Sequence, residues 1–175
     1  FKGQHSGRAL LERFKEGGGT LFDLEYLVDE TGRRVAAFGY WAGYAGAAVS
    51  LFAWAAQQQE KVCSPVGANP NRDAMLADLG ATLRETGDAR PNAIVIGALG
   101  RVGTGSSDLL EAMGVQVTRW DIAETAHGGP FPEILGHDLF INCILARPNT
   151  PVFVPQSALD AERNLTVIGD VACDP

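Results

Sequence analysis

Three glycines at every third position, Gly97, Gly100 and Gly103, follow a short apolar run at residues 93–96. Glycines between a strand and a helix let the backbone turn tightly and approach a pyrophosphate, and the helix N-terminus adds free N–H groups and partial positive charge. The spacing is G-x-x-G-x-x-G rather than the usual G-x-G-x-x-G of dinucleotide-binding turns. The glycines therefore indicate a phosphate-binding turn, with an ordinary tight turn between a strand and a helix as the alternative.

Asp121 follows the next apolar run, and it lies about as far beyond Gly97 as the ~20 residues expected for a ribose-binding carboxylate. A carboxylate at the end of this strand can accept hydrogen bonds from both ribose hydroxyls of an adenosine, and it would repel a 2′-phosphate. The position therefore favours NAD over NADP as the cofactor. The alternative is an aspartate that only caps the following helix.

The remaining chemistry-bearing side chains give weaker signals. The histidines and cysteines are scattered without ligand spacing, so no metal site is predicted. Arg33 and Arg34 are adjacent after a turn, and they are either solvated surface charges or a pair that grips a phosphate and a carboxylate. Twenty-one acidic against fourteen basic side chains give a net charge of −7, which argues against a nucleic-acid partner.

Two kinds of hydrophobic pattern position these residues. The first part of the chain predicts a helix at 8–16, a hairpin with strands at 21–28 and 33–38, and a buried helix at 40–59. After a loop at 64–71, the pattern predicts helices at 73–86 and 106–113, a helical turn at 157–162, and strands at 93–96, 115–120, 139–145 and 165–171. This alternation predicts an α/β fold, a Rossmann-like parallel sheet with helices on both faces.

Residues 35–56 carry no formal charge and are long enough to cross a bilayer, but the run is rich in alanine and glycine. Such residues insert weakly into lipid and suit a helix that packs closely inside a protein, so we expect no membrane association. The chain begins with Phe1, and no secretory leader is recognisable. With an odd number of widely spaced cysteines, these features predict a reduced, cytoplasmic protein, and both ends are expected to be cuts in a longer polypeptide.

Seven stretches of the sequence resemble one enzyme family, the NAD-dependent, lysine-forming saccharopine dehydrogenases. They occur in the family's order across nearly the whole chain, and the most specific is GRRVAAFG at 32–39. The others are GTLFDLE at 19–25, AGYAGAA at 42–48, VIGALGR at 95–101, WDIAETA at 120–126, GGPF at 128–131 and INCI at 141–144. The resemblance implies an oxidoreductase that acts with NAD on the CH–NH group of a secondary amine, converting saccharopine to L-lysine and 2-oxoglutarate in lysine biosynthesis.

The resemblance also implies roles for single residues. On the substrate side it places Gln4, Arg34, Phe38, Ala172, Cys173 and Asp174, although Cys173 departs from the family's pattern. On the cofactor side it places Arg33, Gly100, Arg101, Asp121, Thr125, Leu145 and Val171, and Leu145 stands where relatives usually carry an aromatic residue. It implies no catalytic residue within the chain, because the family's acid–base lysine and histidine precede the matching region. We therefore expect the chain alone to be inactive.

The family has two Rossmann-like domains with the active site in the cleft between them, which implies a division of this chain. Residues 1–38 would end a first, substrate-side domain, 39–63 would be an interdomain crossover helix, and 64–175 would begin the NAD-binding domain. Two other functions stay open: an alanine-dehydrogenase-like amino-acid oxidoreductase, and a non-catalytic nucleotide-binding or assembly module. The double-arginine block with Phe38 favours the saccharopine dehydrogenase resemblance over the first of these. The sequence carries no indication of oligomeric state.

Overall fold

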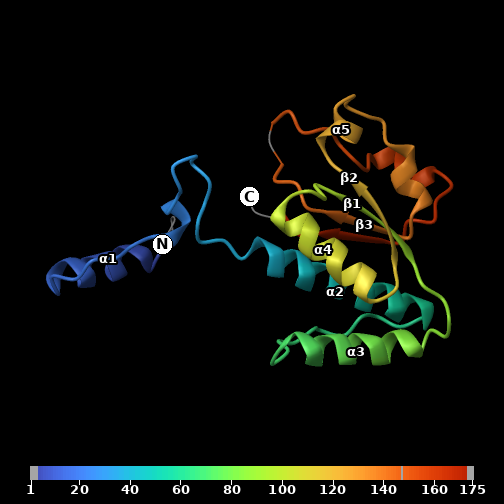
Figure 1. The fold of residues 1–175 in the computed structure, drawn as a ribbon, viewed down its shortest axis with the longest axis horizontal. Helices are drawn as coiled ribbons and strands as arrows, with labels where there is room; N and C mark the ends of the chain where they lie inside the picture. Colours follow the sequence, from blue (N-terminus) through green and yellow to red (C-terminus); the bar gives the residue numbers. More distant parts are fainter. Residues whose placement is uncertain (1–3, 147, 173–175) are drawn as a thin grey trace. The chain divides into compact units, whose positions relative to one another are not determined.

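The computed structural model describes residues 4–146 and 148–172, and the chain divides into two units, Phe1–Phe38 and Gly39–Pro175. Figure 1 shows the helices and strands of both units and labels α1 to α5 and β1 to β3. The first unit contains helix α1, Gly7–Glu16, close to the range predicted from the sequence. Both clusters of buried apolar side chains belong to the second unit, which therefore contains the hydrophobic core.

A turn stabilised by one aspartate follows in the first unit, where the sequence predicts a hairpin. Asp29 Oδ1 accepts hydrogen bonds from the Thr31 hydroxyl, the Arg33 N–H and the Thr31 N–H, at 2.7, 3.0 and 2.9 Å. These three bonds favour the ionised carboxylate and lower the pKa of Asp29. The predicted turn is confirmed.

The two predicted strands on either side of this turn are wrong. The antiparallel pairing is reduced to a single bridge between Val28 and Arg34, and part of the first predicted strand forms the 3-10 helix η1, Leu24–Tyr26. An isolated two-stranded ribbon is marginal in water unless one of its faces is covered. The alternating apolar side chains find no such cover in this unit, since Phe22 is 80% and Tyr26 76% exposed.

Helix α2, Gly39–Gln58, begins the second unit and confirms the buried helix predicted from the sequence. Tyr44, Leu51 and Trp54 are among its buried side chains. In the part of the chain that the structure describes, no helix combines the length and the apolar character that a membrane crossing requires.

A sheet of four parallel strands, in the order β2-β1-β3-β4, forms the centre of the described part of the second unit. The strands are β1 (Asn92–Ile96), β2 (Gln116–Trp120), β3 (Leu139–Asn142) and β4 (Val167–Asp170). The helices around them are α3 (Arg72–Arg84), α4 (Arg101–Ala112), α5 (Ile122–Thr125) and the 3-10 helices η2 (Pro132–Gly136) and η3 (Gln156–Asp160). The predicted α/β class with a Rossmann-like parallel sheet is confirmed, although β3 and β4 are shorter than predicted and α4 begins earlier.

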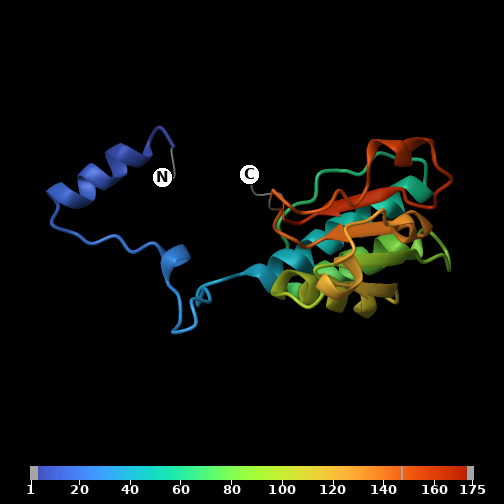
Figure 2. The same cartoon turned by 90° about the horizontal axis from the view of Figure 1, so that it is seen from above.

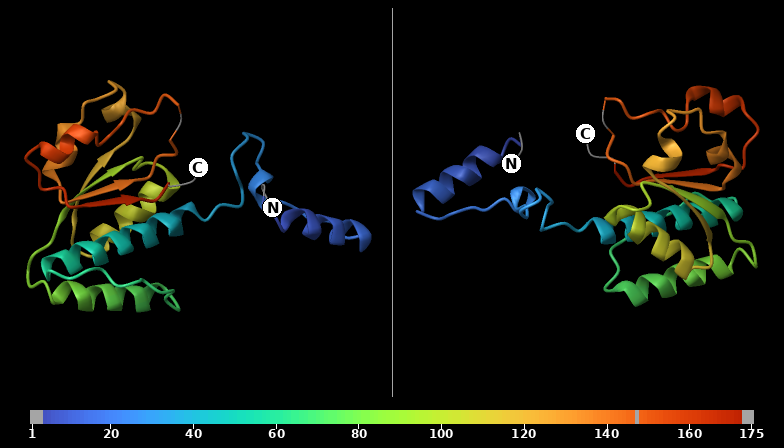
Figure 3. Two further views of the ribbon diagram at one scale, coloured as in Figure 1. Left: turned by 180° about the vertical axis from the view of Figure 1, so that it is seen from behind. Right: turned by 45° about the horizontal axis from the view of Figure 1, so that its top comes forward.

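The two faces of the sheet are covered differently (Figure 2). Helices α2 and α4 pack on one face, and Figure 3 shows α3 on the side of α2 that is turned away from the sheet. Ala93 and Val95 of β1 contribute to the larger hydrophobic cluster on this face. Ile94 and Phe140 contribute to a smaller cluster on the opposite face, which η2 and the neighbouring loops close. The connections on that side contain several prolines, which favour short helical turns and loops over long helices.

Helices α2 and α4 approach each other so closely that neither has room for a side chain where they cross. A Cβ on Gly43 would overlap the carbonyl group of Val102, and a Cβ on Gly105 would overlap the carbonyl group of Tyr40. The buried hydroxyl of Ser106 donates a hydrogen bond of 3.0 Å to the Gly43 carbonyl across the same crossing. Main chain thus packs directly on main chain, which explains the glycines at position 43 of α2 and position 105 of α4.

We expect Gly43→Ala to lower the free energy of unfolding by about 1–3 kcal/mol, because the new methyl group must displace a carbonyl group in a packed crossing. Gly67→Ala is the matched control, since a Cβ on Gly67 would have no neighbouring atom within 4 Å. Denaturant unfolding of both variants measures the difference. Equal stability of the two variants would contradict the close crossing.

Candidate functional site

The carboxyl ends of the four strands lie level along one edge of the sheet. Their last residues are paired in register across the sheet: Trp120 with Ile96, Ile96 with Asn142, and Asn142 with Asp170. Backbone hydrogen bonds continue this order one residue further, from the N–H groups of Gly97, Cys143 and Val171 to the last carbonyl of a neighbouring strand. The loops that follow the strands therefore begin side by side.

The path of the chain through the sheet reverses between β1 and β3. From β1 the chain passes through α4 to β2 on one side, and it then returns across β1 to add β3 and β4 on the other side. In open parallel sheets, ligands bind in the crevice beyond the carboxyl ends of the strands at such a reversal. The loops that begin at Gly97 and Cys143 lie at this reversal.

The glycine turn after β1 has no room for side chains at its first and third glycines. Gly97 adopts a φ of +84°, and a Cβ there would lie 3.0 Å from the carbonyl group of Cys143. A Cβ on Gly103 would overlap the main chain of Gly97 and Ala98, so this glycine lets α4 pack directly against the turn. Gly100 is the N-cap of α4, and a Cβ there would meet only the Gly97 carbonyl, at 3.4 Å. The three positions fit the turning, approach and packing roles of glycines in a dinucleotide-binding turn.

Asp121 connects the end of β2 to the glycine turn through both of its carboxylate oxygens. Oδ2 accepts a hydrogen bond from the Leu99 N–H in the turn, and Oδ1 accepts one from the Ile122 N–H, each at 2.9 Å. Asp121 is also the N-cap of α5, and its own N–H donates to the Glu124 carboxylate at 2.7 Å to complete a capping box. The capping alternative is therefore correct as local structure. It leaves room for a ligand, because an ionised carboxylate oxygen can accept more than one hydrogen bond.

Two exposed aliphatic side chains flank this carboxylate, and sequence reasoning missed both. Leu99 is 80% and Ile122 is 77% exposed, although each donates its backbone N–H to Asp121. Full burial of such a side chain is worth roughly 1.5–3 kcal/mol, so their exposure at this edge suits contact with an apolar ligand surface. The signal available in the sequence is their position, one inside the turn and one directly after Asp121.

The other residues predicted on the cofactor side lie along the same edge. Arg101 is the first residue of α4, and Thr125 is the last residue of α5, where its hydroxyl donates to the Asp121 carbonyl at 2.8 Å. Leu145 follows β3 and is 57% exposed, and the half-buried Val171 follows β4. The cofactor-side residues of the second unit are thus brought together at the carboxyl ends of the strands.

The predicted substrate-side segment after β4 is described only at its first residue. Ala172 directly follows Val171 and is half-buried. Cys173 and Asp174 lie outside the described residues, so their predicted roles have no structural counterpart.

Four predicted ligand contacts belong to the first unit: Gln4, Arg33, Arg34 and Phe38. Gln4 precedes α1, and Phe38, which is 75% exposed, ends the unit. The Arg33 carbonyl accepts a hydrogen bond of 2.8 Å from the Asp29 N–H, and Arg34 takes part in the single antiparallel bridge. Adjacent residues on extended backbone direct their side chains to opposite sides, so the two arginines can serve different ligands.

Cys143, the first residue after β3, lies beside the glycine turn. Its Sγ is 3.4 Å from the Ser106 hydroxyl of α4. Burial raises the pKa of the Cys143 thiol to about 11, with the contact to Ser106 opposing the rise and the charge of Asp170 adding to it. The thiol is therefore protonated at neutral pH and behaves as a small apolar group that packs against the larger hydrophobic cluster.

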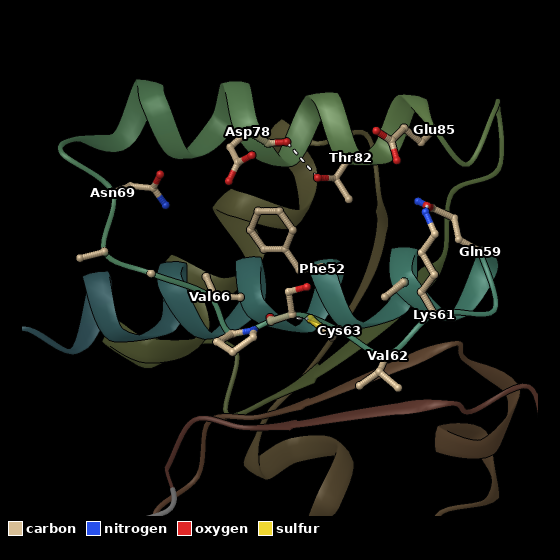
Figure 4. A pocket seen from close by; sticks show the side chains of 15 residues that line it. Phe52, Gln59, Lys61, Val62, Cys63, Val66, Asn69, Asp78, Thr82 and Glu85 are labelled. Atoms are coloured by element: carbon tan, nitrogen blue, oxygen red, sulfur yellow. Dashed lines mark hydrogen bonds between the residues drawn. The ribbon is translucent and has the colours of Figure 1, made fainter.

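Two large cavities of the second unit lie away from the glycine turn. They measure about 540 and 420 Å³, and both border α2, α3 and the linker between these helices. Figure 4 shows the cavity of about 420 Å³, with Phe52 of α2 projecting toward Asp78 and Thr82 of α3. Among the described residues, no group of three or more His, Cys, Asp or Glu side chains could hold a metal ion. Neither cavity is lined by a residue of the glycine turn or by Asp121.

No family model matches the chain. Over 99% of its length it is 46% identical to the saccharopine dehydrogenase (NAD(+), L-lysine-forming) of Neurospora crassa, 45% to that of Yarrowia lipolytica and 43% to that of Candida glabrata. The chain spans about half the length of each relative, namely 49%, 50% and 50%. Nearly the whole chain is therefore similar in sequence to about half of each of these saccharopine dehydrogenases.

Proposed function

We propose that the chain is part of an enzyme that oxidises saccharopine with NAD to L-lysine and 2-oxoglutarate. The high identity of nearly the whole chain to relatives of that name supports the proposal. The structural observation that carries it is the Asp121 carboxylate, which is held against the glycine turn at the carboxyl ends of parallel strands. The names of the relatives do not favour an alanine-dehydrogenase-like enzyme or a non-catalytic module.

The residues at this edge suit a dinucleotide of the NAD type. At Gly100, the N-cap of α4, an added Cβ would meet only the Gly97 carbonyl, and the N-terminus of this helix adds the partial positive charge that suits a pyrophosphate. The Asp121 carboxylate can accept ribose hydroxyls, and the two exposed aliphatic side chains beside it suit a purine face. Arg119, a cation that could attract a 2′-phosphate, is instead paired with Glu111 of α4 at 2.8 Å. This arrangement supports NAD over NADP.

The chain's own residues would bind and orient the ligands. NAD, when bound, supplies the hydride acceptor for oxidation of the substrate's CH–NH group. We infer that Arg34 grips a substrate carboxylate with two parallel hydrogen bonds and that Arg33 acts on the cofactor side. Gln4, Phe38 and Ala172 are proposed as further substrate contacts. The acid–base lysine and histidine are proposed to lie in the half of the relatives that this chain does not span, so the chain supplies binding surface rather than proton transfer.

We expect Asp121→Ser in the natural-length protein to weaken NAD binding by roughly 1.5–3 kcal/mol, because a charge-assisted hydrogen bond to the ribose is lost. NADP binding should weaken much less, since the same change removes the repulsion of the 2′-phosphate. Serine still caps a helix well, which keeps α5 in place. Calorimetric titration with each cofactor measures both dissociation constants.

The control for this experiment is Asp88→Asn, which removes one negative charge from an exposed loop position. It should leave the affinity for both cofactors unchanged. Equal weakening of NAD and NADP by Asp121→Ser, or a preference of the unchanged protein for NADP, would refute the assignment.

We expect Arg34→Lys to raise the KM for saccharopine strongly while NAD binding stays nearly intact, because lysine cannot form two parallel hydrogen bonds to a carboxylate. Arg33→Lys is the matched comparison and should weaken NAD binding more than it changes the KM for saccharopine. Steady-state kinetics of the natural-length enzyme separate the two effects. If Arg34→Lys changed the kinetics with saccharopine by less than twofold, worth ~0.4 kcal/mol of transition-state stabilisation, the two arginines would instead be solvated surface charges.

A further inference from the structure

Asn142, the last residue of β3, contacts the beginnings of two loops at once. Its Nδ2 donates a hydrogen bond of 2.9 Å to Asp170 Oδ1 at the end of β4, and its Oδ1 accepts one of 3.2 Å from the Ile144 N–H. Its main-chain carbonyl accepts a third bond, of 3.0 Å, from the Val171 N–H. One residue therefore holds both the loop that leads to Leu145 and the segment after β4.

The loop after β3 has little freedom to move relative to the glycine turn. A Cβ on Gly97 would lie 3.0 Å from the Cys143 carbonyl group and 3.0 Å from Cγ1 of Ile144. The Gly97 main chain and this loop are therefore already in close contact, and the Cys143 N–H is bonded to the Ile96 carbonyl at 2.9 Å. A shift of Ile144 by a few tenths of an ångström would press on the turn or open a gap beside it.

The chemistry of the two side-chain partners, Asp170 and the Ile144 N–H, suits an amide at position 142. A carboxylate such as Asp170 accepts and an N–H group such as that of Ile144 donates, so the side chain between them must offer one donor and one acceptor. The amide of Asn142 does this in a single orientation. An aspartate there would bring two carboxylates together, and an alanine would leave the Ile144 N–H without this acceptor.

We propose that Asn142 is a positioning residue. It holds the loops after β3 and β4 in the position, relative to the glycine turn, that dinucleotide binding requires. The inference rests on the proposed NAD function and adds a residue to it that need not touch the ligand. It acts through Ile144 and Val171, which border the two segments that carry Leu145 and Ala172.

The test exchanges the two side chains. Asn142→Asp should weaken NAD binding at least tenfold, because it places a carboxylate against Asp170. The double variant Asn142→Asp/Asp170→Asn has the same net charge as the unchanged protein and restores one donor and one acceptor with their order reversed. It should regain an NAD affinity within about threefold of the unchanged protein, since the Ile144 N–H and the amide introduced at position 170 both find their acceptor. Calorimetric titration of the natural-length protein measures each affinity.

The matched control is Asn92→Asp at the opposite edge of the same sheet. Asn92 Oδ1 accepts from the Asp138 N–H, and Asp138 Oδ2 accepts from the Asn92 N–H, both at 2.8 Å. The substitution again brings two carboxylates together, but far from the glycine turn. It should lower the Tm about as much as Asn142→Asp while leaving NAD affinity within twofold.

The proposal is overturned if the exchange of Asn142 and Asp170 fails to restore the affinity for NAD. It is also overturned if Asn92→Asp lowers the affinity for NAD as much as Asn142→Asp does. Should Asn142→Asp not fold, Asn142→Ser replaces it, because a serine hydroxyl is too short to hold both partners. The same tenfold loss is then expected, and an affinity within twofold of the unchanged protein overturns the proposal. Absence of NAD binding by the unchanged protein would refute the proposed function and this inference with it.

Discussion

Parallel hydrogen bonding sets the level at which each strand of the second unit ends, and the arrangement of the candidate site depends on it. The first N–H of each loop after β1, β3 and β4 donates to the last carbonyl of a neighbouring strand, so these loops begin level with one another at the same edge of the sheet. Residues far apart in the sequence, such as Gly97, Asp121 and Val171, are thereby aligned along a single edge. A slip of one residue in any strand would turn its side chains to the other face and move its loop out of line.

Close approach of main chain to main chain fixes the helix that begins at the glycine turn. Helix α4 meets the turn through Gly103 on one side and crosses α2 through Gly105 on the other. The two contacts leave the helix little freedom to slide or rotate. Both the position of its N-terminus, which carries the partial positive charge, and the orientation of the helix axis are therefore fixed.

Local patterns predicted the elements whose structure depends on near neighbours. The uncharged run of α2, rich in alanine and glycine, and the apolar run of β1 with the glycines after it were sufficient to place these elements correctly. Helix α4 was predicted to begin at Ser106, whereas it begins at Arg101, because Gly103 and Gly105 lower helix propensity and are kept for their close contacts. The strands of the hairpin in the first unit were predicted from alternation alone, which does not say whether a covering layer is present.

The candidate site could be predicted only where a motif carries its own chemistry. The glycine turn and Asp121 were found because their spacing has a physical reason. The bond between Asn142 and Asp170 was missed, because neither residue belongs to a recognisable motif and only the sheet register brings them together. The exposed Leu99 and Ile122 were missed because exposure is a property of the folded chain.

The half-buried position of Cys143 has a consequence for covalent labelling and oxidation. Alkylating agents and peroxides react with the thiolate, and a thiol whose pKa is about 11 is almost entirely protonated at neutral pH. Cys143 should therefore react more slowly with oxidants at neutral pH than a thiol of ordinary pKa does. Because the thiol lies against the Ser106 hydroxyl of α4, its modification at neutral pH would report that the contact between this loop and α4 has opened.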